Sequence, residues 1–164
     1  MNSITASAFT SALSQAANGV SIVTTSDGKQ RAGLTVSSMC SVCADPALIL
    51  VCVNADNEFC VQAEENKHFA INILNSEQSN LGMIFAGLTE EENADRFQTG
   101  VWSQLTTGSP ILKDALVALD CRLESSTLKG THNIYYGQVV DVRTTGGEPL
   151  LYTDRSFATA LRIP

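Results

Sequence analysis

The stretch Arg31–Asn54, RAGLTVSSMCSVCADPALILVCVN, decides the fold that the sequence predicts. Its first part alternates, with apolar side chains on one side and Thr35 and Ser37 on the other, as expected of a strand with one solvent face. After an Asp-Pro turn comes an unbroken apolar run, Ala47–Val53, which is too short to cross a membrane and is typical of a strand buried on both faces. We therefore expect a segment lined with hydroxyls beside an apolar strand.

The hydroxyl groups of this stretch suggest a ligand site. Ser38 and Ser41 add further hydroxyls before the turn. Small donors beside an apolar wall suit a planar ligand with a phosphorylated tail, because the wall packs against the ring while hydroxyls and loop amides reach the oxygens. The alternative is a sheet strand whose Thr and Ser side chains simply face water, and the residue types leave both interpretations open.

The rest of the chain predicts short strands separated by turns. Strands are expected at residues 20–25, 31–37, 47–53, 69–74, 115–124, 133–143 and 150–153. Helical segments are expected within 1–19, where an apolar face should cover the sheet, around Phe59, and at 76–86. This pattern predicts a mainly β fold, an antiparallel barrel or sandwich with short flanking helices. The chain, residues 1–164, is expected to form a single domain.

Composition argues against several classes of function. The net charge of -7 and the absence of any run of Lys or Arg argue against nucleic-acid binding, which needs clustered cations. The sequence shows no signal peptide and no stretch that suits a membrane span. The odd number of five cysteines is then typical of reduced thiols, and we expect a cytoplasmic protein. Cys52 and Cys121 are expected to be small core residues.

The chain lacks three common motifs of nucleotide-binding and hydrolytic enzymes, namely G-x-G-x-x-G, the Walker P-loop and G-x-S-x-G. Cys40 and Cys43 form a C-x-x-C pair, for which a redox dithiol and half of a zinc site are the functional interpretations. Ordinary reduced thiols are the interpretation that the surrounding residues favour, and we predict no metal site.

Histidines and a late arginine are the remaining candidates. His132 follows a flexible turn at Gly130 and could present its imidazole to an anionic ligand, although a plain turn histidine would look the same. Arg155 is a lone cation between aromatic residues, and its alternative is a surface arginine whose stem packs on a ring. His68 is expected to have a surface or capping role, and the acidic residues 90–92 are expected to form a solvated face.

Taken in order along the chain, several segments resemble a known family. The segments are Ala32–Ser38 with Cys40–Val42 and Asp45-Pro46, Leu50–Asn54, Phe69–Leu74, Arg96-Phe97 with Trp102, Gly130–His132 and Asp154–Phe157. Together they resemble the flavin reductase-like, FMN-binding split-barrel family, particularly the small reductase components of two-component flavin monooxygenases such as hydroxyphenylacetate monooxygenase. The resemblance implies a homodimer of split β-barrels that binds FMN or FAD, reduces it with NADH or NADPH and supplies a separate oxygenase.

The resemblance also implies roles for individual residues. The cofactor-binding residues that it implies are Thr35, Val36, Ser37, Ser38, Ser41, Cys52, Val53, Asn54, Phe59, His132 and Arg155. Among these, His132 would lie near the nicotinamide as the catalytic residue, and Arg155 near a phosphate or the dinucleotide. Hydride transfer needs no acid or base from the protein, because the flavin carries the reactivity. A non-catalytic flavin-binding or electron-transfer module on the same barrel is the alternative function.

Overall fold

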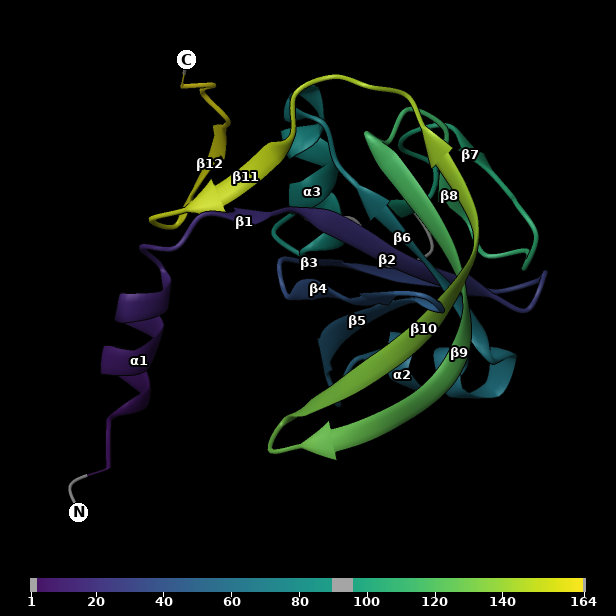
Figure 1. The fold of residues 1–164 in the computed structure, drawn as a ribbon, viewed down its shortest axis with the longest axis horizontal. Helices are drawn as coiled ribbons and strands as arrows, with labels where there is room; N and C mark the ends of the chain where they lie inside the picture. Colours follow the sequence, from purple (N-terminus) through teal and green to yellow (C-terminus); the bar gives the residue numbers. More distant parts are fainter. Residues whose placement is uncertain (1–2, 90–95, 164) are drawn as a thin grey trace.

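A computed structural model describes residues 3–89 and 96–163 of the chain. Its main unit is a seven-stranded antiparallel sheet that curls into a barrel, with strand order β3-β2-β6-β9-β10-β5-β4 (Figure 1). These strands are β2 (Ser21–Ser26), β3 (Arg31–Val36), β4 (Met39–Ala44), β5 (Ala47–Asn54), β6 (His68–Ile73), β9 (Val117–Lys129) and β10 (His132–Thr144). The prediction of a mainly β, antiparallel barrel with short flanking helices is confirmed.

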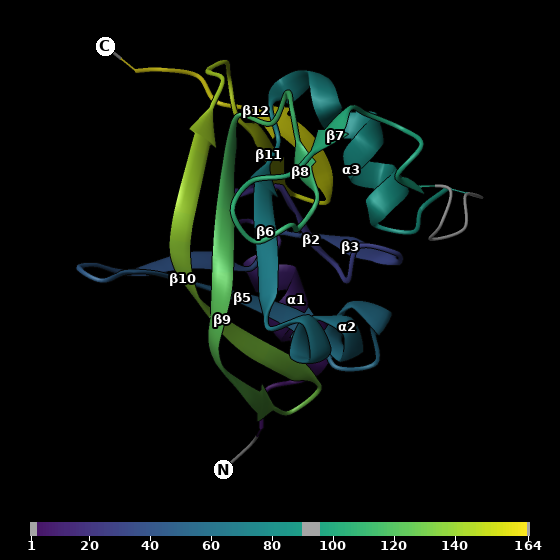
Figure 2. The same ribbon diagram turned by 90° about the vertical axis from the view of Figure 1, so that its right-hand side faces the viewer.

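Smaller elements surround the barrel. A three-stranded sheet consists of β1 (Asn18–Gly19), β11 (Leu150–Thr153) and β12 (Ser156–Thr159), and a two-stranded one of β7 (Trp102–Ser103) and β8 (Ile111–Leu112). The helices are α1 (Ala6–Leu13), α2 (Glu58–Asn66), η1 (Ser76–Gln78) and α3 (Ser79–Phe85). Figure 2 shows α2 and α3 on the same side of the sheet. Within the described residues, no helix has the length and apolar character needed to cross a membrane.

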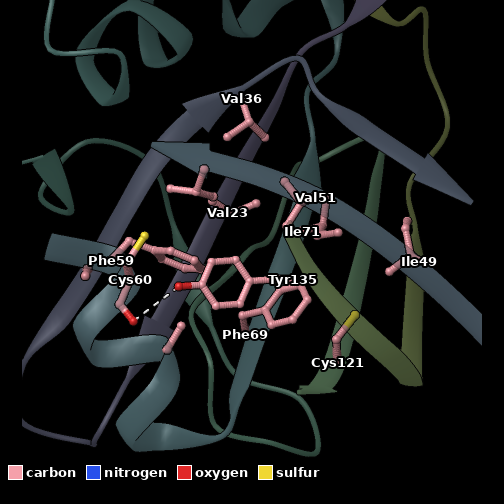
Figure 3. Packing of buried hydrophobic residues seen from close by; sticks show 13 residues of the cluster. Val23, Val36, Ile49, Val51, Phe59, Cys60, Phe69, Ile71, Cys121 and Tyr135 are labelled. Carbon is pink, nitrogen blue, oxygen red and sulfur yellow. Dashed lines mark hydrogen bonds between the residues drawn. The ribbon is translucent and has the colours of Figure 1, made fainter. Parts of the chain in front are cut away.

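An aromatic cluster fills the centre of the barrel. Tyr135 is fully buried and packs edge-to-face against Phe59 and Phe69, with ring centroids 5.9 and 6.4 Å away (Figure 3). Its hydroxyl donates a hydrogen bond of 3.4 Å to the Cys60 carbonyl of α2. Burial raises the pKa of Tyr135, so the hydroxyl keeps its proton and remains a donor. The cluster therefore holds α2 against the strands.

The barrel closes at the bend between β3 and β4. These strands are the two edges of the seven-stranded sheet, yet they follow one another in the chain through Ser37 and Ser38. The Cys52 N–H of β5 donates to the Ser38 carbonyl at 3.0 Å, and Ser38 Oγ donates to the Cys52 carbonyl at 2.8 Å. These two hydrogen bonds between Ser38 and Cys52 fix the position of the bend, where the hydroxyl-bearing residues Ser37 and Ser38 are exposed at the surface.

Burial along β5 corrects one prediction. Buried side chains alternate with half-buried ones from Leu48 to Val53, so the strand is not buried on both faces. The reason is that only one face of β5 looks into the barrel. Cys52 lies on the other face and is half-buried, whereas Cys121 is fully buried, as predicted.

The N-terminal helix also differs from its prediction. It is capped by Thr5 and ends at Leu13, while Asn18–Gly19 forms strand β1 and not a helix stop. None of its residues is buried, and Phe9 and Leu13 are 52% and 54% exposed. Figure 1 shows α1 standing apart from the barrel. Its apolar face therefore covers no face of the sheet within this chain.

Five of the described strands lie outside the predicted strand segments, namely the two-residue strands β1, β7 and β8 and the longer strands β4 and β12. β4 is an edge strand, mostly exposed, with an irregular register between Ser41 and Cys43, so its side chains show no clean period of two. β12 pairs only with β11 and follows a two-residue turn. The acidic residues 90–92, predicted to form a solvated face, lie outside the described residues.

Candidate functional site

Two hollows meet on the surface beside the bend between β3 and β4. The larger, of about 460 Å³, lies between the C-terminal part of α1, the bend residue Ser38 and Arg155 of the β11–β12 turn. The smaller, of about 190 Å³, lies between the end of β3, α3 and Phe157. Ser37 and Tyr152 line both hollows. They therefore form one continuous surface in two parts.

The predicted hydroxyl residues divide between this surface and its scaffold. Ser37 is exposed where the hollows meet. Thr35 lines the smaller hollow, and its hydroxyl donates to the Gly82 carbonyl of α3 at 2.7 Å. Ser38 lines the larger hollow, and its hydroxyl hydrogen-bonds to the Cys52 carbonyl of β5, which holds the bend between β3 and β4 against β5 (the barrel seam). Ser41 is exposed on β4 and lines neither hollow.

Arg155 gives the larger hollow its positive charge. It follows Asp154 in the β11–β12 turn, and the two residues have φ of 59° and 45°, a left-handed conformation that is rare for residues with a side chain. The Asp154 N–H donates to the Ser14 carbonyl at 2.6 Å, which ties the turn to the end of α1. Such strained residues are concentrated at binding sites, where the surrounding structure holds them in place.

The guanidinium of Arg155 is available to a ligand. Among the described residues, the salt bridges join Lys67 to Glu64 and Arg162 to Glu148, and neither involves Arg155. An exposed arginine that is not engaged in a salt bridge can form charge-assisted, bidentate hydrogen bonds to a phosphate.

The surface beside the two hollows continues along the end of β5, from Cys52, which is hydrogen-bonded to Ser38, through Val53 and Asn54 to His132. Asn54 and His132 are exposed and lie opposite each other in the β5–β10 register. Val53 is buried, so only its backbone can face a ligand. Burial raises the pKa of the Cys52 thiol, which therefore stays neutral near pH 7. These residues give the surface a neutral edge.

The structure corrects the place of Phe59 and adds two residues, Tyr152 and Phe157, that are not among the cofactor-binding residues implied by the resemblance. Phe59 is fully buried against Tyr135 in the core, so its side chain is not at this surface and we leave it out of the site. Tyr152 and Phe157 face each other across the β11–β12 pair, with ring centroids 5.7 Å apart, and both line the smaller hollow. Their sequence signal is the pair of aromatics around the Arg155 turn.

A buried polar chain contains the other histidine. His68 Nδ1 lies 2.7 Å from Ser109 Oγ, which lies 3.0 Å from Thr107 Oγ1. Thr107 donates to the buried Asp120 carboxylate from its hydroxyl at 2.5 Å and from its N–H at 2.6 Å. These contacts fix the segment between β7 and β8 to the barrel wall. His68 is half-buried and belongs to this wall, not to the surface or a helix cap.

We expect His68 to make stability depend on pH. Burial lowers its pKa below the ordinary 6.5, while the negative charge of Asp120 opposes that shift. Below about pH 6.5 the unfolded chain therefore binds a proton that the folded chain does not, and the free energy of unfolding falls until the folded-state pKa is passed. Urea unfolding at pH 7.5 and 5.5 should show a smaller loss for His68→Gln than for the wild type. An equal loss in both proteins would contradict this assignment, and His132→Gln, at an exposed histidine, is the control.

Within residues 3–89 and 96–163, the C-x-x-C pair has no further ligand placed for metal binding. Cys40 and Cys43 are exposed and free, and their thiols donate to the Ser41 and Pro46 carbonyls of their own hairpin at 3.2 and 3.0 Å. In the part of the chain that the structure describes, no group of three or more His, Cys, Asp or Glu side chains is placed to hold a metal ion.

Comparison with known proteins decides the family. Residues 13–161 match the model of the flavin reductase like domain. The chain belongs to the flavin reductase-like family. The reductase is 35% identical over 162 residues to the FMN reductase (NADH) RutF 1 of Methylorubrum extorquens, a match that covers 98% of this chain and 80% of the relative.

Solved structures agree with this assignment. The reductase superposes on the flavin reductase PheA2 with a TM-score of 0.89, 28% identity and coverage of 97% of this chain and 100% of PheA2. BorF, the flavin reductase component of a bacterial two-component tryptophan halogenase, gives a TM-score of 0.86 and 26% identity over 94% of this chain and 98% of BorF. The predicted family, barrel fold and enzyme class, a nicotinamide-dependent flavin reductase, are thereby confirmed.

Proposed function

We propose that the reductase transfers a hydride from NADH to FMN on the surface that runs from the two hollows to His132. The observation that carries this proposal is the meeting of Ser37, Ser38 and Arg155 in one hollow beside the β5 edge. The choice of FMN and NADH follows the name of the Methylorubrum extorquens relative. We also propose that residues 1–164 act as one domain.

The residues present fit a flavin with a phosphorylated side chain. A hollow of about 460 Å³ is within the range of small-molecule sites, and its hydroxyls and one cation suit a phosphate. The neutral edge at Cys52–Asn54 suits the uncharged ring system. When bound, the flavin supplies the hydride acceptor, and the protein holds nicotinamide and flavin in contact and excludes competing geometries.

A direct assay tests this function. Purified protein is mixed with NADH and FMN, and the nicotinamide absorbance is followed, with FAD and NADPH as the other substrate pairs. We expect steady NADH oxidation in the presence of excess flavin. A protein that takes up FMN yet oxidises neither nicotinamide would be the non-catalytic flavin module instead.

His132 is proposed to serve the nicotinamide more than the flavin. It lies at the far end of the surface from Arg155, next to Asn54 in the β5–β10 register. Losing one hydrogen-bonding group costs about 1 kcal/mol, so His132→Ala should raise the KM for NADH about fivefold while leaving the FMN Kd within about twofold. Steady-state kinetics and fluorescence titration measure the two quantities. Leu128→Ala, at an exposed position on the same hairpin, is the control, and equal loss of both affinities would show that His132 is misplaced.

We propose that the reductase is a homodimer. Large apolar side chains are exposed at both ends of the chain, including Phe9 at 52%, Leu161 at 90% and Ile163 at 89%. Phe9 and Leu13 lie one turn apart on α1, none of whose residues is buried, and a second copy of the chain would cover this apolar face symmetrically. Phe9→Asp should raise the dimer dissociation constant at least about tenfold. Light scattering over a range of concentrations measures it, with Val61→Asp on α2 as the control; a wild type that is monomeric throughout would contradict the proposal.

We further propose that reduced flavin passes to a separate oxygenase component. BorF is such a component of a halogenase system, which supports the same division of labour for this chain. All five cysteines are free in the structure, as expected in a reducing compartment, so we place the enzyme in the cytoplasm, where NADH is available.

A further inference from the structure

We infer that a separate hollow at the start of β3 is a binding site for a small planar carboxylate, meaning a single ring that carries one carboxyl group. This hollow, of about 300 Å³, is called the Arg31 hollow and is lined by Arg31, Trp102, Ser103, Gln104 and Pro110. None of these is among the cofactor-binding residues implied by the resemblance. Arg31 begins β3 and Val36 ends it, so the hollow lies about 17 Å along the strand from the bend that carries Ser37. The inference therefore does not depend on the proposed function.

The guanidinium of Arg31 is held in place while its N–H groups stay available. Its Cζ lies 4.7 Å from the centroid of the Phe97 ring, a cation–π contact that restricts the side chain. Phe97 is buried, and its ring packs edge-to-face against Phe85 at 5.1 Å and Trp102 at 5.0 Å, so it has little room to move. A phenyl ring has no acceptor oxygen, so the guanidinium can still form a bidentate pair of hydrogen bonds to a carboxylate.

The charge around the Arg31 hollow favours a single anionic group. Among the described residues, the salt bridges do not involve Arg31, and no carboxylate lines the hollow. A second guanidinium, that of Arg143, donates to Ser103 Oγ at 2.8 Å and adds positive charge behind the lining. The whole chain carries a net charge of -7, which disfavours polyanions at longer range. A small monoanion is therefore the ligand that these charges select.

The walls of the Arg31 hollow favour a planar ligand. Trp102 is half-buried, and its indole is oriented by the hydrogen bond of 2.9 Å that Nε1 donates to the Thr99 carbonyl. Pro110 adds a second apolar side chain to the lining, and Gln104 adds an exposed amide that suits a polar substituent. A volume of about 300 Å³ is at the lower end of small-molecule sites, which suits one ring with a short acidic group.

Benzoate is the probe, and Trp102 reports its binding because it is the only tryptophan of the chain. Flavin-free protein is titrated with benzoate while the tryptophan emission is followed, and equilibrium dialysis measures the bound benzoate independently. We expect saturable binding with a Kd on the order of 1 mM, the affinity that about nine non-hydrogen atoms supply. Benzamide lacks the charge, while acetate and inorganic phosphate lack the ring, and each should bind at least about tenfold more weakly.

Variants of Arg31 test the assignment to this hollow. Arg31→Gln should weaken benzoate binding at least about tenfold, because it removes the charge-assisted pair of hydrogen bonds. Arg31→Lys keeps the charge but loses the planar pair of donors, and its Kd should be intermediate. Arg122→Gln is the matched control, since Arg122 is an exposed arginine of β9 that lines none of the three hollows, and it should bind benzoate as the wild type does. Circular dichroism checks that each variant folds.

Several results would overturn the inference. One is dialysis that shows no saturable benzoate binding, and another is equal affinity of the wild type and Arg31→Gln for benzoate. Equal affinity for benzoate and benzamide, or for benzoate and phosphate, would show that the carboxylate or the ring plays no part. The FMN Kd of Arg31→Gln should match that of the wild type, and a parallel loss would contradict a separate site. A protein that binds benzoate but neither binds flavin nor oxidises NADH would support this site and refute only the proposed function.

Discussion

Replacing Ser37 with tryptophan is expected to weaken FMN binding about a hundredfold, equivalent to about 2.7 kcal/mol. Ser37 is exposed at the junction of the two hollows, so an indole at this position occupies the space that the flavin tail needs. The fold should survive, because Ser37 lies in a bend and its side chain is outside the core. Fluorescence titration with FMN measures the Kd, and far-ultraviolet circular dichroism checks the fold.

Two further variants separate the steric effect of Ser37→Trp from other causes. Ser37→Ala removes only a hydroxyl and should cost about three- to tenfold in Kd, the scale of one hydrogen bond. Val42→Trp introduces the same indole at an exposed position of β4 that lines neither hollow and should leave binding unchanged. If Ser37→Trp binds FMN as well as Val42→Trp does, the flavin tail does not occupy this junction.

Gly137→Val should destabilise the fold by about 3 kcal/mol, at the upper end of the usual cost of overpacking. A Cβ added at Gly137 of β10 would lie 2.5 Å from Phe69 Cζ and 2.9 Å from Cys121 Cβ. The Phe69 ring is fully buried and packs against Tyr135, so it has no free space into which to move. Urea denaturation measures the loss of unfolding free energy.

Gly19→Val is the matched control for Gly137→Val, because no atom lies within 4 Å of a Cβ added at Gly19. It should change the unfolding free energy by less than about 0.5 kcal/mol. Combining Gly137→Ala with Phe69→Leu should recover part of the loss caused by Gly137→Ala, since the smaller side chain frees space. A Gly137→Val variant as stable as the Gly19→Val control would show that β10 and the core pack differently.

The regular part of the barrel is predictable because its strands are rich in apolar and β-branched residues and are separated by turns. Strands β2, β3, β6, β9 and β10 lie within a few residues of the predicted positions, although β2 is buried along its whole length and not on one face alone. β4 is not predictable in this way, since an exposed edge strand has no constraint on either face. The position of α1 is not predictable either, because an apolar helix face does not reveal whether it packs on its own chain or on another.

Only part of the candidate site could be predicted from the sequence. Ser37 and Ser38 stand out because hydroxyls precede an apolar strand, and Arg155 because it is a lone cation between aromatics. The contribution of Tyr152 depends on bringing β11 next to the β3–β4 bend, which no local pattern encodes. Phe59 was predicted to bind the cofactor, but this prediction is wrong. Although Phe59 follows Asn54 closely in the sequence, its side chain is buried in the core.

The most direct measurement is a crystal structure of the reductase with FMN bound. The account predicts the phosphate within hydrogen-bonding distance of the Ser37 or Ser38 hydroxyl and of the Arg155 guanidinium, with the ring system extending along Cys52–Asn54 toward His132. An FMN molecule bound on another face of the barrel, or lying with its ring in the larger hollow and its phosphate at His132, would contradict it.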